Sequence, residues 1–134
     1  MKTKKEVELL IPKDKFDNNN IEELIALTNK EIEPIIPDLL IWFTDMNLNV
    51  TKELVAVLST REEILRKQLN DILSNLEEDP IFKYNIINHI LASFSVEDLK
   101  NYEKSLKRIV EKPTVKEVHY ETPVVANKIY SLIK

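Results

Sequence analysis

The chain has no glycine among its 134 residues, and this absence constrains its fold more than any residue it contains. Glycine serves where the backbone needs a positive φ or must approach a ligand closely, so phosphate-binding loops and nucleophile elbows depend on it. Walker A loops, dinucleotide fingerprints and the G-x-S-x-G motif are therefore missing. Most common enzyme architectures are disfavoured together.

The sequence also offers few residues for catalysis by cysteine, histidine or a metal ion. The chain has no cysteine, which excludes disulfides, thiolate nucleophiles and cysteine-based zinc sites. His89 has no acid three or four residues away, and the two-residue spacing of Glu117 and Glu121 from His119 places these acids on other helical faces. We therefore predict no catalytic residue, no metal ligand and no cofactor-binding residue.

The composition of the chain argues against nucleic acid and membranes as partners. The net charge is −4 and the pI is near 5.3, which argues against a nucleic-acid partner because such partners usually require a basic stripe. Hydrophobic residues make up 43% and charged residues 31%, as in ordinary globular proteins. The apolar runs fall short of the ~20 residues that cross a bilayer, and the start, MKTKKEVELL, lacks an apolar signal-peptide core. We expect a cytoplasmic protein that does not contact a membrane.

The apolar spacing is helical along nearly the whole chain. Leu65, Leu69, Leu73 and Leu76 form one stripe of an amphipathic helix. The pattern predicts helices over residues 20–30, 34–45, 50–59, 61–76, 80–94, 96–111 and 123–133. Short connections predict antiparallel neighbours in a single domain, residues 1–134, with residues 1–12 as an extended N-terminal arm.

Helix boundaries also carry signals. Asp79 precedes a proline, and Thr114 with Glu117 forms a capping box that marks a further helix start. Without glycine, we expect asparagine to take the left-handed conformation at helix ends, and Asn29, Asn47 and Asn75 stand near such ends.

A weak internal repeat is visible. EELIA at residues 22–26 returns as KELVA at 52–56, and the stripe Leu69, Leu73, Leu76 returns as Tyr102, Leu106, Ile109. A period in the thirties built from helix pairs is typical of an α-solenoid. The predicted fold is therefore all-α, a HEAT-like α-α superhelix of about three antiparallel helix pairs plus a C-terminal helix.

Two stretches offer candidate interaction residues. Trp42, the only tryptophan, precedes Asp45 and Asn47, which form either a polar site or the turn between two helices with Trp42 packed in the core. Lys83 and Tyr84 flank the apolar stripe of the helix that begins at Pro80, where they either face a partner or form the rim of the core. The candidate interaction surface is Trp42, Asp45, Asn47, Lys83 and Tyr84.

Four segments resemble a known family: LIPKDKFD (10–17), PIIPDLLIWFTDMN (34–47), IFKY (81–84) and LKRIVEKPT (106–114) are similar to the bacterial domain-of-unknown-function family 5071. The resemblance implies a HEAT-like helical repeat and no known activity or cofactor. The family pattern has Trp-Pro where Leu48 and Asn49 stand, and tryptophan where Phe82 and Asn85 stand. If those aromatics form a binding surface, it is weakened here; if they fill core and turn positions, leucine and phenylalanine serve.

These observations predict a small, non-catalytic helical-repeat domain that binds another protein, and one specific form of this hypothesis is that the chain itself serves as an immunity- or antitoxin-like partner. The alternative is an enzyme, or a helical repeat acting on nucleic acid, with a polar pocket around Trp42, Asp45 and Asn47. The patterns name neither the partner nor the oligomeric state.

Overall fold

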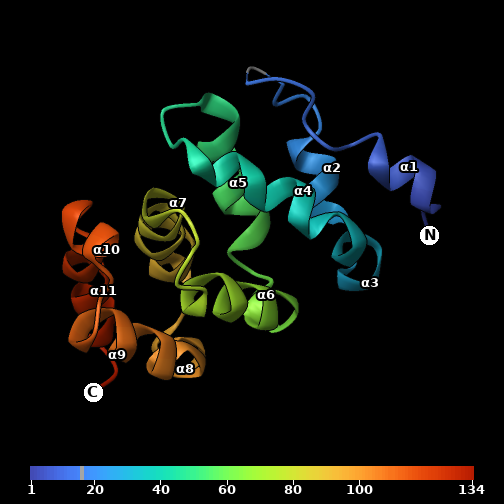
Figure 1. Cartoon of the computed structure of the whole chain (residues 1–134). Helices are drawn as coiled ribbons and strands as arrows, with labels where there is room; N and C mark the ends of the chain where they lie inside the picture. Colours follow the sequence, from blue (N-terminus) through green and yellow to red (C-terminus); the bar gives the residue numbers. More distant parts are fainter. Residues whose placement is uncertain (16) are drawn as a thin grey trace. The chain divides into compact units, whose positions relative to one another are not determined.

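The computed structural model describes residues 1–15 and 17–134, which form helices joined by turns, and no strand occurs among them (Figure 1). The prediction of an all-α fold is confirmed. Phe16, in the first family-like segment, lies outside the described residues. The chain groups into two compact units, Met1–Ile64 and Leu65–Lys134, and the boundary falls inside α6 (Glu62–Ser74). The single domain over residues 1–134 stays a prediction.

The first unit is built from short helices that bury one apolar face each. They are α1 (Lys4–Glu8), α2 (Ile21–Ala26), α3 (Asn29–Ile32), η1 (Glu33–Ile35), α4 (Ile36–Leu40), η2 (Ile41–Thr44) and α5 (Asn49–Leu58). The helix predicted over residues 20–30 is interrupted, because Leu27 is extended and Thr28 begins α3 with a capping box to Glu31. α2 packs against α5 in this unit, and Leu24, Leu54 and Leu58 are fully buried.

The N-terminal segment is not the extended arm predicted for residues 1–12. The Thr3 hydroxyl accepts a hydrogen bond from the Glu6 N–H, and the Glu6 carboxylate accepts one from the Thr3 N–H. This capping box starts α1, whose Val7 is buried, and Leu10 after it is buried too. Leu9 between them is 65% exposed. The prediction was wrong because this local capping signal was not recognised.

The second unit contains the rest of α6 and the helices that follow it. They are α7 (Pro80–Asn85), the π-helical turn η3 (Ile86–Ile90), η4 (Leu91–Ser93), α8 (Val96–Leu99), η5 (Lys100–Tyr102), α9 (Glu103–Glu111), α10 (Val115–His119) and α11 (Thr122–Tyr130). α11 packs against both α9 and α7, and Leu69, Leu73, Tyr102 and Leu106 lie in the core. The capping box of Thr114 and Glu117 starts α10 as predicted, although the apolar spacing alone predicts no helix over residues 112–122.

Helix ends are made without left-handed asparagine. Among the described residues only Glu121, between α10 and α11, has a positive φ, at 62°. The left-handed conformation expected for Asn29, Asn47 and Asn75 is therefore wrong. Several helices instead end in extended residues: Leu27 (ψ 146°), Asp45 (ψ 107°) and Phe94 (ψ 157°). An extended residue needs no glycine, but it leaves the last carbonyl groups of the helix without the partners that a left-handed cap provides.

A buried arginine supplies those partners for α2. The Nη2 atom of Arg61 donates to the carbonyl oxygens of Leu24 (3.0 Å), Ile25 (2.9 Å) and Leu27 (2.7 Å), and its Nε donates to that of Val57 (3.1 Å). Burial lowers the pKa of Arg61 from its usual value. A guanidinium group carries enough donors to satisfy several carbonyls, and its charge favours the negative end of a helix. Arg61 thus completes the end of α2.

Replacing Arg61 with lysine tests this role. The ammonium group keeps the charge but cannot reach the same set of carbonyls, so we expect a loss of about 2 kcal/mol or more in the free energy of unfolding, measured with urea. Lys67→Gln, which breaks an exposed ion pair with Asp71, should cost under about 0.5 kcal/mol. Equal losses in the two variants would contradict the assignment.

Candidate functional site

Helix α10 buries an acidic side chain and exposes apolar ones. Of its two charged residues, Lys116 is exposed but Glu117 is only 1% exposed, whereas Val115 is 86% and Val118 56% exposed. Tyr120, which follows the helix, is exposed as well. Helices in globular proteins normally place the apolar side chains inside and the charges in water. The reversed pattern singles out α10 as the most unusual element of the second unit.

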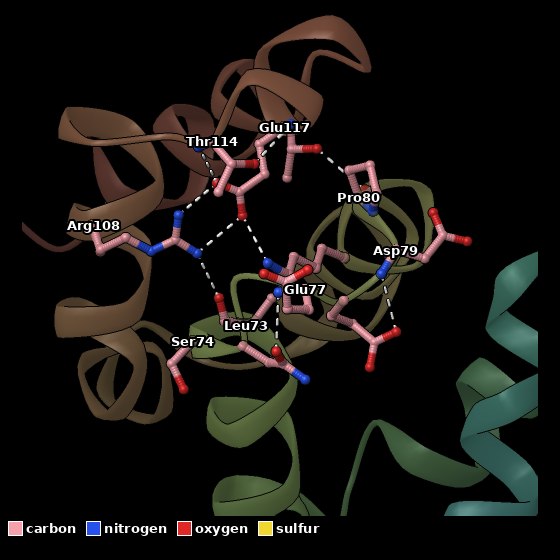
Figure 2. A network of polar contacts seen from close by, with 12 residues as sticks. Leu73, Ser74, Glu77, Asp79, Pro80, Arg108, Thr114 and Glu117 are labelled. Carbon is pink, nitrogen blue, oxygen red and sulfur yellow. Dashed lines mark hydrogen bonds and ion pairs between the residues drawn. The ribbon is translucent and has the colours of Figure 1, made fainter.

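Glu117 is held by donors from three segments of the chain (Figure 2). Lys83 Nζ, from α7, donates to Oε2 at 2.8 Å, and Arg108, from α9, donates through Nη2 to the same oxygen at 2.9 Å and through Nη1 to Oε1. The backbone N–H of Thr114 donates to Oε1 at 2.8 Å. Arg108 Nη2 also donates to the carbonyl of Leu73 near the end of α6, at 2.8 Å. One carboxylate thereby ties α10 to α7 and α9, and Arg108 extends the network to α6.

The network fixes the charge of Glu117. Burial alone would raise the pKa of this carboxyl group, but the hydrogen bonds from Arg108, Lys83 and Thr114 outweigh burial and lower the pKa to about 2. Glu117 is therefore ionised at neutral pH and fully engaged by its partners. Such a group cannot act as a general acid or base near neutral pH, where a catalytic pKa close to the working pH is needed. The network is structural.

An open cleft of about 540 Å³ lies beside the network, between α10 and the turn that leads into α7. Its lining combines apolar, acidic and basic side chains: Glu77, Asp79, Pro80, Ile81, Val115, Lys116, His119 and Tyr120. The Thr122 hydroxyl donates to the carbonyl of Pro80 at 3.1 Å, which joins the start of α11 to the start of α7 at this place. The rings of His119 and Tyr120 meet edge to face, with centroids 4.8 Å apart. We call this lining and Val118 the α10 surface.

A second cleft of about 580 Å³ follows the seam between α6, η5 and α9, and Arg108 lines it. Its central polar group is already paired within the chain. Asn70 Nδ2 donates to the carbonyls of Arg66 and Asn101, and Asn70 Oδ1 accepts from the Ser105 hydroxyl at 2.7 Å. Because these groups are satisfied by one another, the seam is a packing contact between helices.

Lys83 was predicted to belong to the interaction surface, and this prediction is wrong. Its side chain is fully buried, and Tyr84 beside it is half-buried. A signal existed in the sequence: Ile86, Ile87 and Ile90 lie three, four and seven residues after Lys83, so the lysine belongs to the apolar stripe. A lysine in such a stripe needs a buried acid as its partner, and Glu117 is that acid.

The turn after Trp42 is organised by its own hydrogen bonds. Asp45 Oδ1 accepts from the Asn47 N–H at 2.9 Å, and the carbonyl of Trp42 accepts from the Thr51 hydroxyl at 2.9 Å. Asp45 and Asn47 are exposed, and Trp42 is half-buried; the neighbouring Phe43 is fully buried. These residues belong to the first unit, whereas Lys83 and Tyr84 belong to the second. The bond between Asp45 and Asn47 is that of an Asx turn leading into α5, and the Thr51 bond ties the turn to that helix.

The comparison with known families covers both units. The model of the family described as Domain of unknown function (DUF5071) matches residues 10–130. The chain belongs to this family. No curated protein matches the chain. The DUF5071 match includes Lys83, Arg108 and Glu117, so both the network and the α10 surface lie within the family region.

The structure places three of the residues at which the chain departs from the expected DUF5071 pattern. Phe82 and Asn85 are both buried in α7, and Leu48 is half-buried before α5. Of the two alternatives left by the sequence, burial favours the one in which Phe82 fills a core position.

Two further properties concern the residues described. No group of three or more histidine, cysteine, aspartate or glutamate side chains gathers there to hold a metal ion. No helix in that part of the chain combines the length and hydropathy that a membrane crossing requires.

Glu117→Gln tests the network through pH. The folded-state pKa of about 2 lies below the usual value of 4.5, so ionised Glu117 stabilises the fold above about pH 5, and this contribution is lost as the pH falls towards 2. Between these limits the wild type should lose on the order of 3 kcal/mol more unfolding free energy than Glu117→Gln. Urea denaturation across the pH range measures the difference. Glu97→Gln, which breaks the exposed ion pair with Lys100, should keep the pH dependence of the wild type.

Asp45→Ala tests the turn. Loss of the acceptor for the Asn47 N–H should lower the unfolding free energy by about 1 kcal/mol, whereas Asp45→Asn, which keeps a side-chain oxygen, should lose less. Thermal and urea denaturation measure both variants. A variant that stays fully stable but no longer binds a protein partner would instead make this turn a binding site.

Proposed function

We propose that this DUF5071 chain is a small, non-catalytic helical domain that binds another protein through the α10 surface. The observation that carries the proposal is the inverted burial of α10, with Glu117 inside and Val115, Val118 and Tyr120 in water. Apolar side chains held together on a surface and rimmed by polar groups are typical of protein interaction sites. The proposal rests on how this exposure is maintained.

The energetic cost of burying charges in α10 supports a binding role for its exposed apolar side chains. Moving a carboxylate and an ammonium group out of water costs several kcal/mol each before their mutual attraction is counted. A helix of five residues has no stability of its own, so α10 depends on its tertiary contacts. Glu117 provides the ion pairs and hydrogen bonds among those contacts, while Val115 and Val118 stay exposed. The chain thus keeps apolar side chains in water at a fixed position, as a preorganised docking surface requires.

The alternative function, chemistry or nucleic-acid binding around Trp42, Asp45 and Asn47, has weaker support. The bonds of Asp45 and Trp42 described above are used to shape the turn. The acidic charge of the chain also disfavours a nucleic-acid partner. Binding to another protein is therefore the better supported function.

We extend the proposal to the architecture: a HEAT-like repeat in a bacterial cytoplasmic protein, with an immunity- or antitoxin-like role as one form. Two arginine contacts support the repeat. Arg61 reaches back 34 to 37 residues to the end of α2, and Arg108 reaches back 35 residues to the end of α6. Equivalent contacts at nearly equal sequence separations are what successive helix pairs would produce.

A matched pair of valine variants tests the binding surface. Val115 and Val96 each stand at the first position of a helix, after Thr114 and Ser95 as N-caps, and an aspartate is well tolerated there. We expect Val115→Asp to lose a protein that the wild type captures from a lysate of the native organism, with unchanged stability. Quantitative mass spectrometry of the captured material measures this.

Val96→Asp is the control, because Val96 is also exposed but lies on α8, outside the α10 surface. It should capture the same protein as the wild type. Equal capture by Val115→Asp and the wild type would contradict the proposed surface, and loss by both variants would point to a general effect of added charge.

A further inference from the structure

The charges of the α10 surface are divided between its two walls. Glu77 and Asp79 lie on the wall formed by the turn before α7, and Lys116 lies on the wall formed by α10. Apolar side chains of Ile81, Val115 and Tyr120 contribute to the same lining. In the part of the chain that the structure describes, the side chains of Glu77 and Lys116 are exposed and have no ion-pair or hydrogen-bond partner. Each wall therefore offers an unpaired charge to whatever covers the cleft.

This arrangement is complementary to itself. A twofold axis lying along the cleft would place the acidic wall of one copy on the basic wall of the other, and the apolar lining on the apolar lining. In such an isologous contact every pairing occurs twice, so Glu77 would meet the partner copy's lysine, and Lys116 the partner copy's glutamate. Any other partner would have to bring both a base and an acid in the matching order.

Resting on the proposed function, we propose that the protein bound by the α10 surface is a second copy of this chain. The contact pairs Val115, Ile81 and Tyr120 across the axis and places Glu77 opposite Lys116 on both sides. The surface is a single short helix and one turn, so the dimer is weak and reversible, at the low end of interface sizes. Glu117 contributes indirectly, because it holds α10 in place.

Charge reversal tests the proposal with the full chain. Sedimentation velocity over a range of protein concentrations should show a reversible dimer. Glu77→Lys alone, and Lys116→Glu alone, should each raise the dimer dissociation constant by about tenfold or more, because each reversal turns two attractions into two repulsions. The double variant Glu77→Lys/Lys116→Glu should return to within about threefold of the wild type. Salt should weaken both effects.

Two controls connect the dimer to this face. Val115→Asp should abolish the dimer and Val96→Asp should leave it unchanged, and circular dichroism should show that all variants are folded. Asp79 is left unchanged because its carboxylate caps α7 through the Ile81 N–H at 2.8 Å.

A chain that is monomeric at every concentration would overturn the second-copy proposal. So would a dimer that survives Val115→Asp, or one that the double charge swap fails to restore. In the monomeric case, loss of a captured protein by Val115→Asp would still support the binding function. If neither capture nor sedimentation responds to Val115→Asp, the binding surface itself is refuted.

Discussion

One buried carboxylate organises the second unit. Glu117 accepts hydrogen bonds from Lys83 in α7, from Arg108 in α9 and from the backbone of Thr114 at the start of its own helix. Because Arg108 also donates to Leu73, the same network reaches the end of α6. Removing one member would leave a charge buried without its partner, a change that typically costs more than the intact network contributes. The position of α10 therefore depends on this set of charges.

Because the chain has no glycine, Arg61 and Arg108 also serve as hydrogen-bond donors to the ends of helices. A left-handed glycine normally satisfies the last carbonyl groups of a helix, and here several helices stop at extended residues instead. Arg61 then donates to the end of α2 and Arg108 to that of α6. Each arginine stands more than thirty positions after the carbonyl groups that it binds, and at the end of α2, where Leu27 is extended, this tertiary contact replaces a local left-handed cap. Helix ends and helix packing are consequently stabilised by the same bonds.

The use of tertiary contacts in place of local signals explains which features the sequence could predict. The 3.6-residue spacing predicted the all-α class, and the pattern of Thr114 and Glu117 predicted the start of α10, because both signals are local. The partner of Lys83 stands 34 residues away, and no local pattern identifies it. The apolar spacing includes Lys83 in the buried stripe, but the general rule that charged side chains face solvent led to its prediction as a surface residue. The turn at Asp45 was foreseen as a structural alternative, since an Asx turn is formed within a few residues.

The network is best understood as a device for orientation. Apolar residues at positions 83 and 117 would avoid the cost of desolvating charges, and such replacements are often neutral or stabilising in other proteins. Apolar packing, however, is non-directional, so it would only weakly favour one rotation of a five-residue helix about its axis. Hydrogen bonds to both carboxylate oxygens fix that rotation, because Lys83 and Arg108 approach from different helices. With Glu117 facing inward, Val115 and Val118 are directed to solvent, so the charges inside determine which apolar side chains a partner would meet.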